Sequence, residues 1–168
     1  MQHVQRMVTR WPLNRKFEHI EVVPESRWML APNRVMVLLR RFSPKEDIRR
    51  VTATPYLADL PGDLIGLENH LNCIAADADA DRSMSANEAI GLAAYLNSAP
   101  VDAHLRAVCG HTQINASDLR RMPFPESASL EALGQSVGGG APLERVDRAV
   151  EAWLALILAV QPASQSRP

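Results

Sequence analysis

The pattern of apolar and polar positions predicts strands in the first half of the chain. A continuous apolar run at residues 35–39 is followed by two arginines, which is typical of a strand that is buried on both faces and emerges at a polar edge. The turn at 43–47 contains a proline, and the segment 49–54 after it favours an antiparallel return strand. A second turn at 61–63 leads into a further expected strand at 65–75.

Helical signals dominate the second half. Ser85 and Glu88 have the spacing of a capping box, and apolar residues follow at helical intervals as far as Asn97. Pro100 suits the first turn of a second helix over 101–109, which Gly110 would end. The sequence therefore predicts a pair of consecutive helices.

Two more helices are expected towards the end of the chain. A short helical segment at 129–137 precedes a long amphipathic one at 142–160, in which Glu144 and Arg148 are spaced as an i,i+4 ion pair. The elements together predict an α+β fold, with a small mixed or antiparallel sheet packed against the helix pair and the C-terminal helix. The strands of that sheet are expected in the regions 35–41, 49–56 and 64–75.

Length and composition favour one domain. The chain has 168 residues and 46% apolar content, which is enough for an ordinary buried core. We expect a single domain over residues 1–160, with an irregular lead-in at 1–31 that prolines interrupt, and a disordered tail at 161–168.

The distribution of charge adds a basic region. The net charge is only −1, but residues 1–60 carry 11 Lys and Arg against 6 Asp and Glu. All the cations except Lys16 and Lys45 are arginines, whose planar guanidinium suits phosphate and guanine. Five cations fall on the predicted hairpin, where they would either contact DNA phosphates or pair with nearby acids and solvent. These five are Arg40, Arg41, Lys45, Arg49 and Arg50.

A polar stretch after the helix pair carries candidate base-reading residues. If residues 111–115 form an extended strand, His111, Gln113 and Asn115 point to one face and Ile114 anchors the other. Gln and Asn side chains can pair with adenine through two hydrogen bonds, but the same side chains could equally satisfy nearby backbone. A capped turn with Arg120 and Arg121 follows.

The predicted strand at 65–75 offers a similar choice. Alternation places Glu68, His70 and Asn72 on one side of it. These three side chains could contact DNA or could form a structural hydrogen-bond network, and the sequence leaves both alternatives open.

Four sequence blocks follow one another along the chain, namely Leu-Arg-Arg-Phe-Ser-Pro-Lys-Glu, Glu-Asn-His-Leu-Asn, Leu-Asn-Ser and Gly-His-Thr-Gln-Ile-Asn-Ala-Ser-Asp-Leu-Arg. In this order they resemble elements of a known family, the restriction–modification adenine-N6 DNA methyltransferases, including the methyltransferase–nuclease fusions. The last block resembles the C-terminal target-recognition region of that family. The resemblance covers about residues 11–156. The blocks lie at 39–46, 66–72, 92–98 and 110–120.

The resemblance implies a DNA-binding target-recognition domain with double-stranded DNA as its partner. Its candidate contact residues are Arg40, Arg41, Lys45, Arg49, Arg50, His70, Asn72, His111, Gln113, Asn115, Arg120 and Arg121. The parent enzyme would use S-adenosylmethionine. This chain has neither the glycine-rich loop for that cofactor nor the Asn-Pro-Pro-Tyr element that holds a flipped base, so we expect no cofactor and no activity in the chain alone.

A second hypothesis is a protein-interaction or oligomerisation module derived from a specificity domain. The apolar face of the last helix would then bind a separate methyltransferase catalytic chain or another copy of this chain. Under either hypothesis we expect a cytoplasmic protein, because two distant cysteines without a CxxC pattern or a secretory leader indicate a reduced chain. The longest apolar run is too short to cross a bilayer, so we expect no membrane partner.

Metal sites are weakly indicated. Asp77, Asp79, Asp81 and Glu88 have the spacing of a calcium loop, but Arg82 occupies the position that requires glycine. A solvated loop is the favoured interpretation, with calcium left open. The histidines and cysteines match no zinc pattern, so no metal site is expected.

Overall fold

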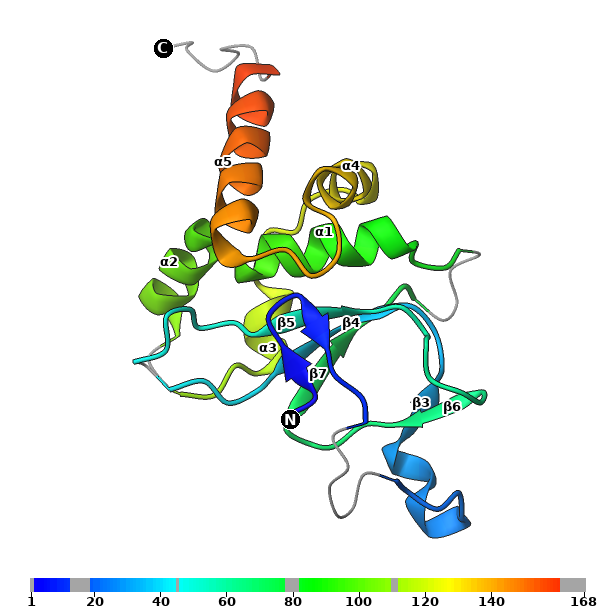
Figure 1. Cartoon of the computed structure of the whole chain (residues 1–168). Coiled ribbons are helices and arrows are strands. Elements are labelled where there is room, and N and C mark those ends of the chain that lie inside the picture. Colours follow the sequence, from blue (N-terminus) through cyan, green and yellow to red (C-terminus); the bar gives the residue numbers. More distant parts are fainter. Residues whose placement is uncertain (1, 13–18, 45, 78–81, 110–111, 161–168) are drawn as a thin grey trace.

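A three-stranded antiparallel sheet forms the centre of the molecule. The computed structural model describes residues 2–12, 19–44, 46–77, 82–109 and 112–160. The sheet has the order β5 (Ala53–Tyr56), β4 (Met36–Arg40), β7 (Leu71–Ile74), and β4 is antiparallel to both neighbours. This sheet and the helices above it confirm the α+β class (Figure 1).

The first four residues of strand β4 are apolar because the strand separates two cores. Val37 and Leu39 belong to the larger core beneath the helices, while Met36 and Leu38 belong to a smaller core on the opposite face. All four side chains are buried. The continuous apolar run in the sequence therefore reflects a strand with no solvent-facing side.

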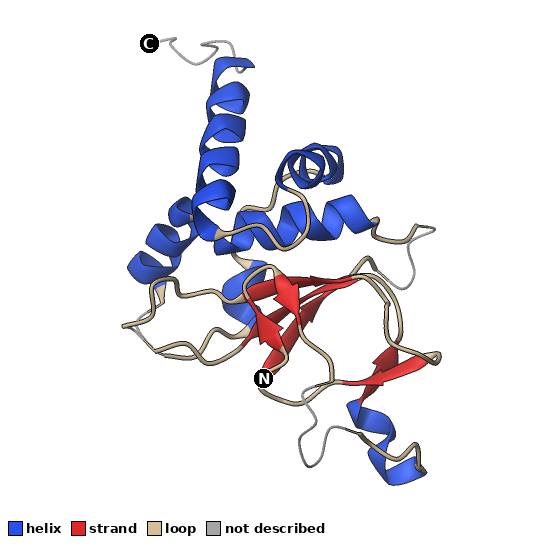
Figure 2. Cartoon of the chain, in the orientation of Figure 1, coloured by secondary structure: helices blue, strands red, loops and turns tan. Residues whose placement is uncertain are grey.

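Helix α1 (Ala86–Asn97) covers one face of the sheet, and the other helices build on it (Figure 2). Helix α4 (Ser127–Val137) crosses α1, and α5 (Leu143–Val160) packs by its first half against both before projecting from the body. Helix α2 (Ala99–Val108) follows α1 directly. Ser85 caps α1 by accepting a hydrogen bond from the Glu88 amide, as its capping-box spacing predicts.

Two glycines allow α1 and α4 to touch through their backbones. A Cβ atom on Gly91 would lie 1.9 Å from the Leu130 carbonyl oxygen, and one on Gly134 would lie 1.8 Å from the Asn87 carbonyl oxygen. No side chain fits at either position, so the close crossing depends on both glycines.

Asn97 fastens the end of α1 to the sheet. Its side chain is completely buried, and its Nδ2 atom donates to the Ala53 and Ala93 carbonyl oxygens at 2.8 and 2.7 Å. Its Oδ1 atom accepts a hydrogen bond from the Ala53 amide at 3.1 Å. The Leu-Asn-Ser block thus has a structural role, because Asn97 pairs with β5 as an additional strand would.

The opposite face of the sheet is covered by short ribbons. Strands β1 (Val4–Gln5) and β2 (Val8–Thr9) pair with each other, as do β3 (Leu30–Pro32) and β6 (Leu64–Gly66). The 3-10 helix η1 (Pro24–Met29) leads into β3. The lead-in at 1–31 therefore carries more regular structure than its prolines suggested.

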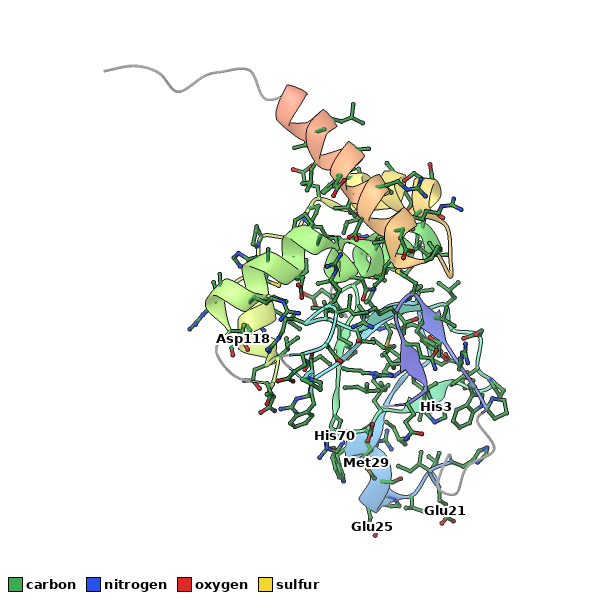
Figure 3. All side chains as sticks on the ribbon, turned by 60° about the vertical axis from the view of Figure 1, so that its left-hand side comes forward. His3, Glu21, Glu25, Met29, His70 and Asp118 are labelled. Atoms are coloured by element: carbon green, nitrogen blue, oxygen red, sulfur yellow. The ribbon has the colours of Figure 1, made fainter. Side chains whose placement is uncertain are left out.

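A cavity of about 920 Å³ lies on this second face. Figure 3 labels three of its lining residues, His3, Met29 and His70. His3 directly precedes β1, Met29 ends η1, and His70 directly precedes β7. The small core on this side therefore does not fill the space between the ribbons.

Two sequence expectations for strands and one for a helix need correction. The segment 65–75 is not one strand, because residues 67–70 break it into β6 and β7, which belong to different sheets. The return strand begins at Ala53 rather than Arg49. Arg148 donates from Nε to the Glu144 backbone carbonyl at 3.2 Å, in place of the expected side-chain ion pair. The tail at 161–168 and Gly110 lie outside the described residues.

The helix crossing gives a stability prediction. Replacing Gly91 with alanine should lower the free energy of unfolding by about 1–3 kcal/mol or more, because the new methyl group must push α4 away from α1. Urea denaturation would measure the change. Gly139→Ala is the matched control, since a Cβ there meets nothing closer than Ile90 Cδ1 at 3.9 Å. Equal stability of the two variants would contradict the close crossing.

Candidate nucleic-acid interface

The two residues that follow β4, Arg41 and Phe42, lie between two other chain segments at a small polar surface. The Arg41 amide donates to the His70 carbonyl oxygen at 2.8 Å on one side. On the other side the Ile114 amide donates to the Arg41 carbonyl oxygen at 2.7 Å, and Phe42 forms an antiparallel bridge with Gln113. Three segments far apart in sequence therefore meet here. We call this the β4-edge surface, formed by Arg41, Phe42, His70, Asn72 and Gln113.

Two exposed rings lie together on the β4-edge surface. The Phe42 and His70 ring centroids are 5.3 Å apart with a tilt of 55°, and Phe42 is 41% exposed. His70 Nδ1 lies 3.1 Å from Glu68 Oε2, which fixes the orientation of the imidazole. An apolar ring held at the surface by a second ring offers a flat face on which a base or sugar can pack.

Among the described hydrogen bonds, the Arg41 side chain binds a backbone carbonyl oxygen and no acidic side chain. Its Nη1 atom donates to the Asn69 carbonyl oxygen at 2.7 Å, and the side chain is half-buried. A guanidinium carries five N–H donors in a fixed fork, so one bond to a carbonyl orients the group without neutralising its charge.

Asn72 has a structural role that the sequence left open. Its Nδ2 atom donates to the Ile114 carbonyl oxygen at 2.9 Å, which ties β7 to the segment that follows α2. Ile114 itself is completely buried and anchors that segment in the larger core. Asn72 therefore favours the network alternative, whereas the exposed His70 stays available for contact.

The polar stretch is not the single strand that its alternation suggested. Gln113 lies at an isolated bridge, and Asn115 is already the N-cap of the short helix α3 (Ala116–Arg120). The Asn115 amide donates to Asp118 Oδ2 at 2.8 Å, which closes the turn. Gln113 and Asn115 therefore do not share one face of a strand. Figure 3 shows His70 and Asp118 both below the layer of helices α1, α4 and α5.

The two arginines after the polar stretch are accessible. Arg120 ends α3 and Arg121 follows it, and both side chains are exposed. His111 and Lys45, which the sequence also singled out, lie outside the described residues.

The hairpin arginines that were expected to crowd one surface differ in their burial and in their partners. Arg40 Nε donates to the Val4 carbonyl oxygen at 2.7 Å, on the side of the β1 ribbon. Arg49 Nη2 forms an ion pair with Asp147 Oδ2 at 2.6 Å, which links the β4–β5 loop to α5. Arg50 is only 2% exposed, so it belongs to the interior and not to a phosphate-binding surface.

Acidic residues of the helices hold the β4–β5 loop in place. Asp102 of α2 accepts hydrogen bonds from the Arg50 amide at 2.5 Å and from Arg106 Nε at 2.8 Å. Arg106 also donates to the Asp47 carbonyl oxygen at 2.7 Å. With the Arg49–Asp147 ion pair, three side-chain contacts to the helices therefore fix the loop, although its sequence predicted only a turn and a return strand.

Sequence reasoning missed two residues. Phe42 belongs to the β4-edge surface, and Arg6 donates from Nη2 to the Arg49 carbonyl oxygen. Phe42 stands directly after two arginines at a polar strand end, and an aromatic residue at such a place is a recognisable signal for stacking. Arg6 gave no signal, because its position beside the sheet depends on the β1–β2 ribbon, whose two-residue strands are too short to predict.

No cluster that could hold a metal ion occurs among the described residues. Glu88 instead receives two hydrogen bonds of 2.9 Å from Arg82, and this guanidinium holds the pKa of the Glu88 carboxyl below its usual range. Asp79 and Asp81 lie outside the described residues.

Both cysteines are free thiols, with Cys73 exposed and Cys109 buried. Burial raises the pKa of the Cys109 thiol, as does the charge of Asp118, which makes that thiol a poor nucleophile at neutral pH. None of the helices in the described part of the chain is long and apolar enough to cross a membrane.

Comparison with known proteins finds two relatives of this chain. The Type II methyltransferase M.PstI of Providencia stuartii is 34% identical over 142 residues, which are 83% of this chain and 27% of that protein. This chain is related to one segment of Type II methyltransferases. M.BsuBI of Bacillus subtilis, also a Type II methyltransferase, is 44% identical over 114 residues, or 66% of this chain and 22% of that protein.

The chain spans about a quarter of the length of these relatives. No family model matches it, and no solved structure gives a significant match. The methyltransferase relationship that the sequence blocks predicted is confirmed in its general part, since both relatives are Type II methyltransferases.

Asn72 provides a test of the structural network. Replacing Asn72 with alanine should lower the free energy of unfolding by about 1 kcal/mol, because the Ile114 carbonyl oxygen loses a donor in a partly buried place. Thermal or urea unfolding without DNA measures this. His70→Ala is the control, because an exposed side chain at this surface should change stability by less than about 0.5 kcal/mol. An unchanged stability of Asn72→Ala would return Asn72 to the candidates for DNA contact.

Proposed function

We propose that this chain is the target-recognition region of a restriction–modification adenine-N6 DNA methyltransferase and that it docks duplex DNA through the β4-edge surface. One observation carries the proposal: three sequence blocks that resemble this family come together at that surface, through Arg41–His70, Arg41–Ile114 and Phe42–Gln113 backbone pairing. The similarity to two type II methyltransferases supports it.

The side chains of the surface suit different parts of DNA. Gln113 can pair with the edge of a base, adenine above all, because its amide offers one donor and one acceptor. Phe42 and His70 offer ring faces for packing against bases or sugars. Arg41, Arg120 and Arg121 supply positive charge for phosphates, which position the protein without reading sequence.

Asn115 has a narrower part in this proposal. It is the N-cap of α3 and lies two residues after Gln113. Its side chain is partly buried, so it contacts DNA only if the duplex reaches the start of that helix. The hydrogen bond from the Asn115 amide to the Asp118 carboxylate holds the turn, which places Arg120 and Arg121 next to the base-reading segment.

Methyl transfer itself is assigned to the rest of the parent enzyme. The sequence has no Asn-Pro-Pro-Tyr element, and its only run of glycines, at 138–140, follows helix α4 rather than a strand. The residues present therefore do not fit S-adenosylmethionine. We propose that the chain is non-catalytic alone and that duplex DNA and a methyltransferase catalytic part are its partners.

Duplex binding should be salt-sensitive and should separate two kinds of variant. Gln113→Ala is expected to cost roughly 1–3 kcal/mol on the cognate duplex and little on other duplexes, because it removes a base contact. Arg121→Gln should weaken binding to every duplex alike and flatten the salt slope by about one unit. Fluorescence anisotropy with a duplex selected from a random pool, over a series of salt concentrations, measures both effects.

Variants for that experiment should first be matched in melting temperature, since Gln113 lies at the backbone bridge to Phe42. If folded Gln113→Ala loses affinity equally for cognate and random duplexes, Gln113 does not read sequence. If micromolar wild-type protein binds no duplex at low salt, the proposed function itself is wrong.

The projecting end of α5 favours a second candidate function in protein association. Leu156 on this helix is 67% exposed, and the helix extends beyond the body (Figure 1). Trp153, however, packs within the chain, with its ring centroid 6.2 Å from that of Tyr95. The apolar surface that remains for a catalytic chain or for a second copy is therefore smaller than the sequence suggested.

Association can be tested separately from DNA binding. If α5 mediates self-association, light scattering should show a dimer that Leu156→Glu converts to a monomer, because a charge cannot be buried in an apolar contact without a large cost. Arg145→Glu, an exposed change nearer the start of the same helix, is the control. A wild-type monomer at all concentrations would reject a homo-oligomer through this helix.

A further inference from the structure

We propose that Arg6, Arg40 and Arg49 form a binding site for one phosphodiester group of the DNA backbone, separate from the β4-edge surface. We call these three residues the arginine cluster. The inference rests on the proposed function, because that function supplies the duplex. It adds a contact residue, Arg6, that neither the sequence pattern nor the family resemblance indicated.

The arginine cluster is assembled from three separate segments. Arg6 lies in the turn between β1 and β2, Arg40 is the last residue of β4, and Arg49 lies in the loop between β4 and β5. Arg6 Nη2 donates to the Arg49 carbonyl oxygen at 3.1 Å. Arg40 Nε donates to the carbonyl oxygen of Val4, two residues before Arg6. Backbone bonds therefore hold these like charges close together.

Several observations show that the cluster is electrostatically incomplete. Burial lowers the pKa of Arg6, and the charges of Arg40 and Arg49 lower it further, which reflects repulsion among the three cations. The Nε atoms of Arg6 and Arg49 are buried and have no hydrogen-bond partner in the described part of the chain. Buried donors without partners are costly, so the chain itself leaves the hydrogen bonding of these two guanidinium groups incomplete.

Nearby carboxylates compensate only part of this charge. Asp47 and Asp102 attract Arg6, but Asp102 already accepts bonds from the Arg50 amide and from Arg106. Asp147 pairs with Arg49 through Oδ2 and accepts from the Ala99 amide through Oδ1. These acids therefore serve the fold, and positive charge is left for a ligand.

The position of the cluster favours a DNA phosphate over a free anion. Arg40 ends β4 and Arg41 follows it, so the backbone of the cluster reaches the strand end at which the β4-edge surface begins. All three arginine side chains are partly exposed, which leaves access from solvent. A contact that reads no base and lies beside base-reading residues would fix the register of the protein on the duplex.

Anisotropy titrations of Arg6→Gln with cognate and random duplexes test the site. The variant should bind every duplex roughly ten-fold more weakly, the equivalent of one charge-assisted hydrogen bond, and its salt slope should be flatter by about one unit. Arg27→Gln, an exposed arginine on η1 away from the cluster, is the control for loss of one charge. If Arg6→Gln binds no more weakly than Arg27→Gln, the site is refuted.

Arg6→Lys separates charge from packing. It keeps the cation, so its salt slope should equal that of the wild type even if its affinity falls. If Arg6→Lys and Arg6→Gln lose the same slope, Arg6 acts through structure and the proposal is overturned. Wild-type protein that binds no duplex at low salt would instead refute the proposed function.

Thermal melts in inorganic phosphate and in chloride, at equal ionic strength, distinguish failure of the Arg6 site from failure of the proposed DNA-binding function. Phosphate should raise the melting temperature of the wild type more than that of Arg6→Gln, because an anion that binds only the folded cluster stabilises it. No difference between the two proteins would refute an oxyanion site at the cluster. A difference without duplex binding would show that the site takes a free phosphate, which contradicts the DNA source proposed here.

Discussion

Hydrogen bonding along both edges of β4 is the constraint on which the rest of the structure depends. The strand separates the two cores, so its register fixes which side chains enter each of them. The same chain continues as Arg41 and Phe42, where it pairs with His70 on one side and with Gln113 and Ile114 on the other. A shift of β4 by one residue would therefore rearrange the core and the candidate interface together.

Arginine is used in three distinct ways around this strand. Arg50 is interior and forms part of the packing, and Arg49 joins a loop to α5 through Asp147. Arg41 is oriented by the Asn69 carbonyl oxygen, with no acid among its described hydrogen bonds. A basic stretch in a sequence therefore says little about which cations face a ligand, because neighbouring residues leave a strand end in different directions and meet different acids.

The separation of roles extends to the polar residues of the blocks. Asn97 and Asn72 both bond to backbone carbonyl oxygens and hold segments together, so their presence in the blocks follows from folding. His70 and Phe42 are exposed and hold no element in place by a comparable buried bond. The exposed residues of these blocks, His70 and Phe42, are therefore better candidates for function than the asparagines that hold the fold together.

The sequence by itself determined the local elements with strong periodic or capping signals. Helices α1, α2, α4 and α5, strand β4 and the α+β class follow from apolar spacing, prolines and the Ser85 cap, all of which act within a few residues. The tertiary structure alone decided the break between β6 and β7, the crossing at Gly91 and Gly134, and the burial of Arg50. Each of these depends on contacts between residues distant in sequence. The β4-edge surface belongs to the same class, because chain pairing and not spacing brings residues 41–42, 70–72 and 113–114 together.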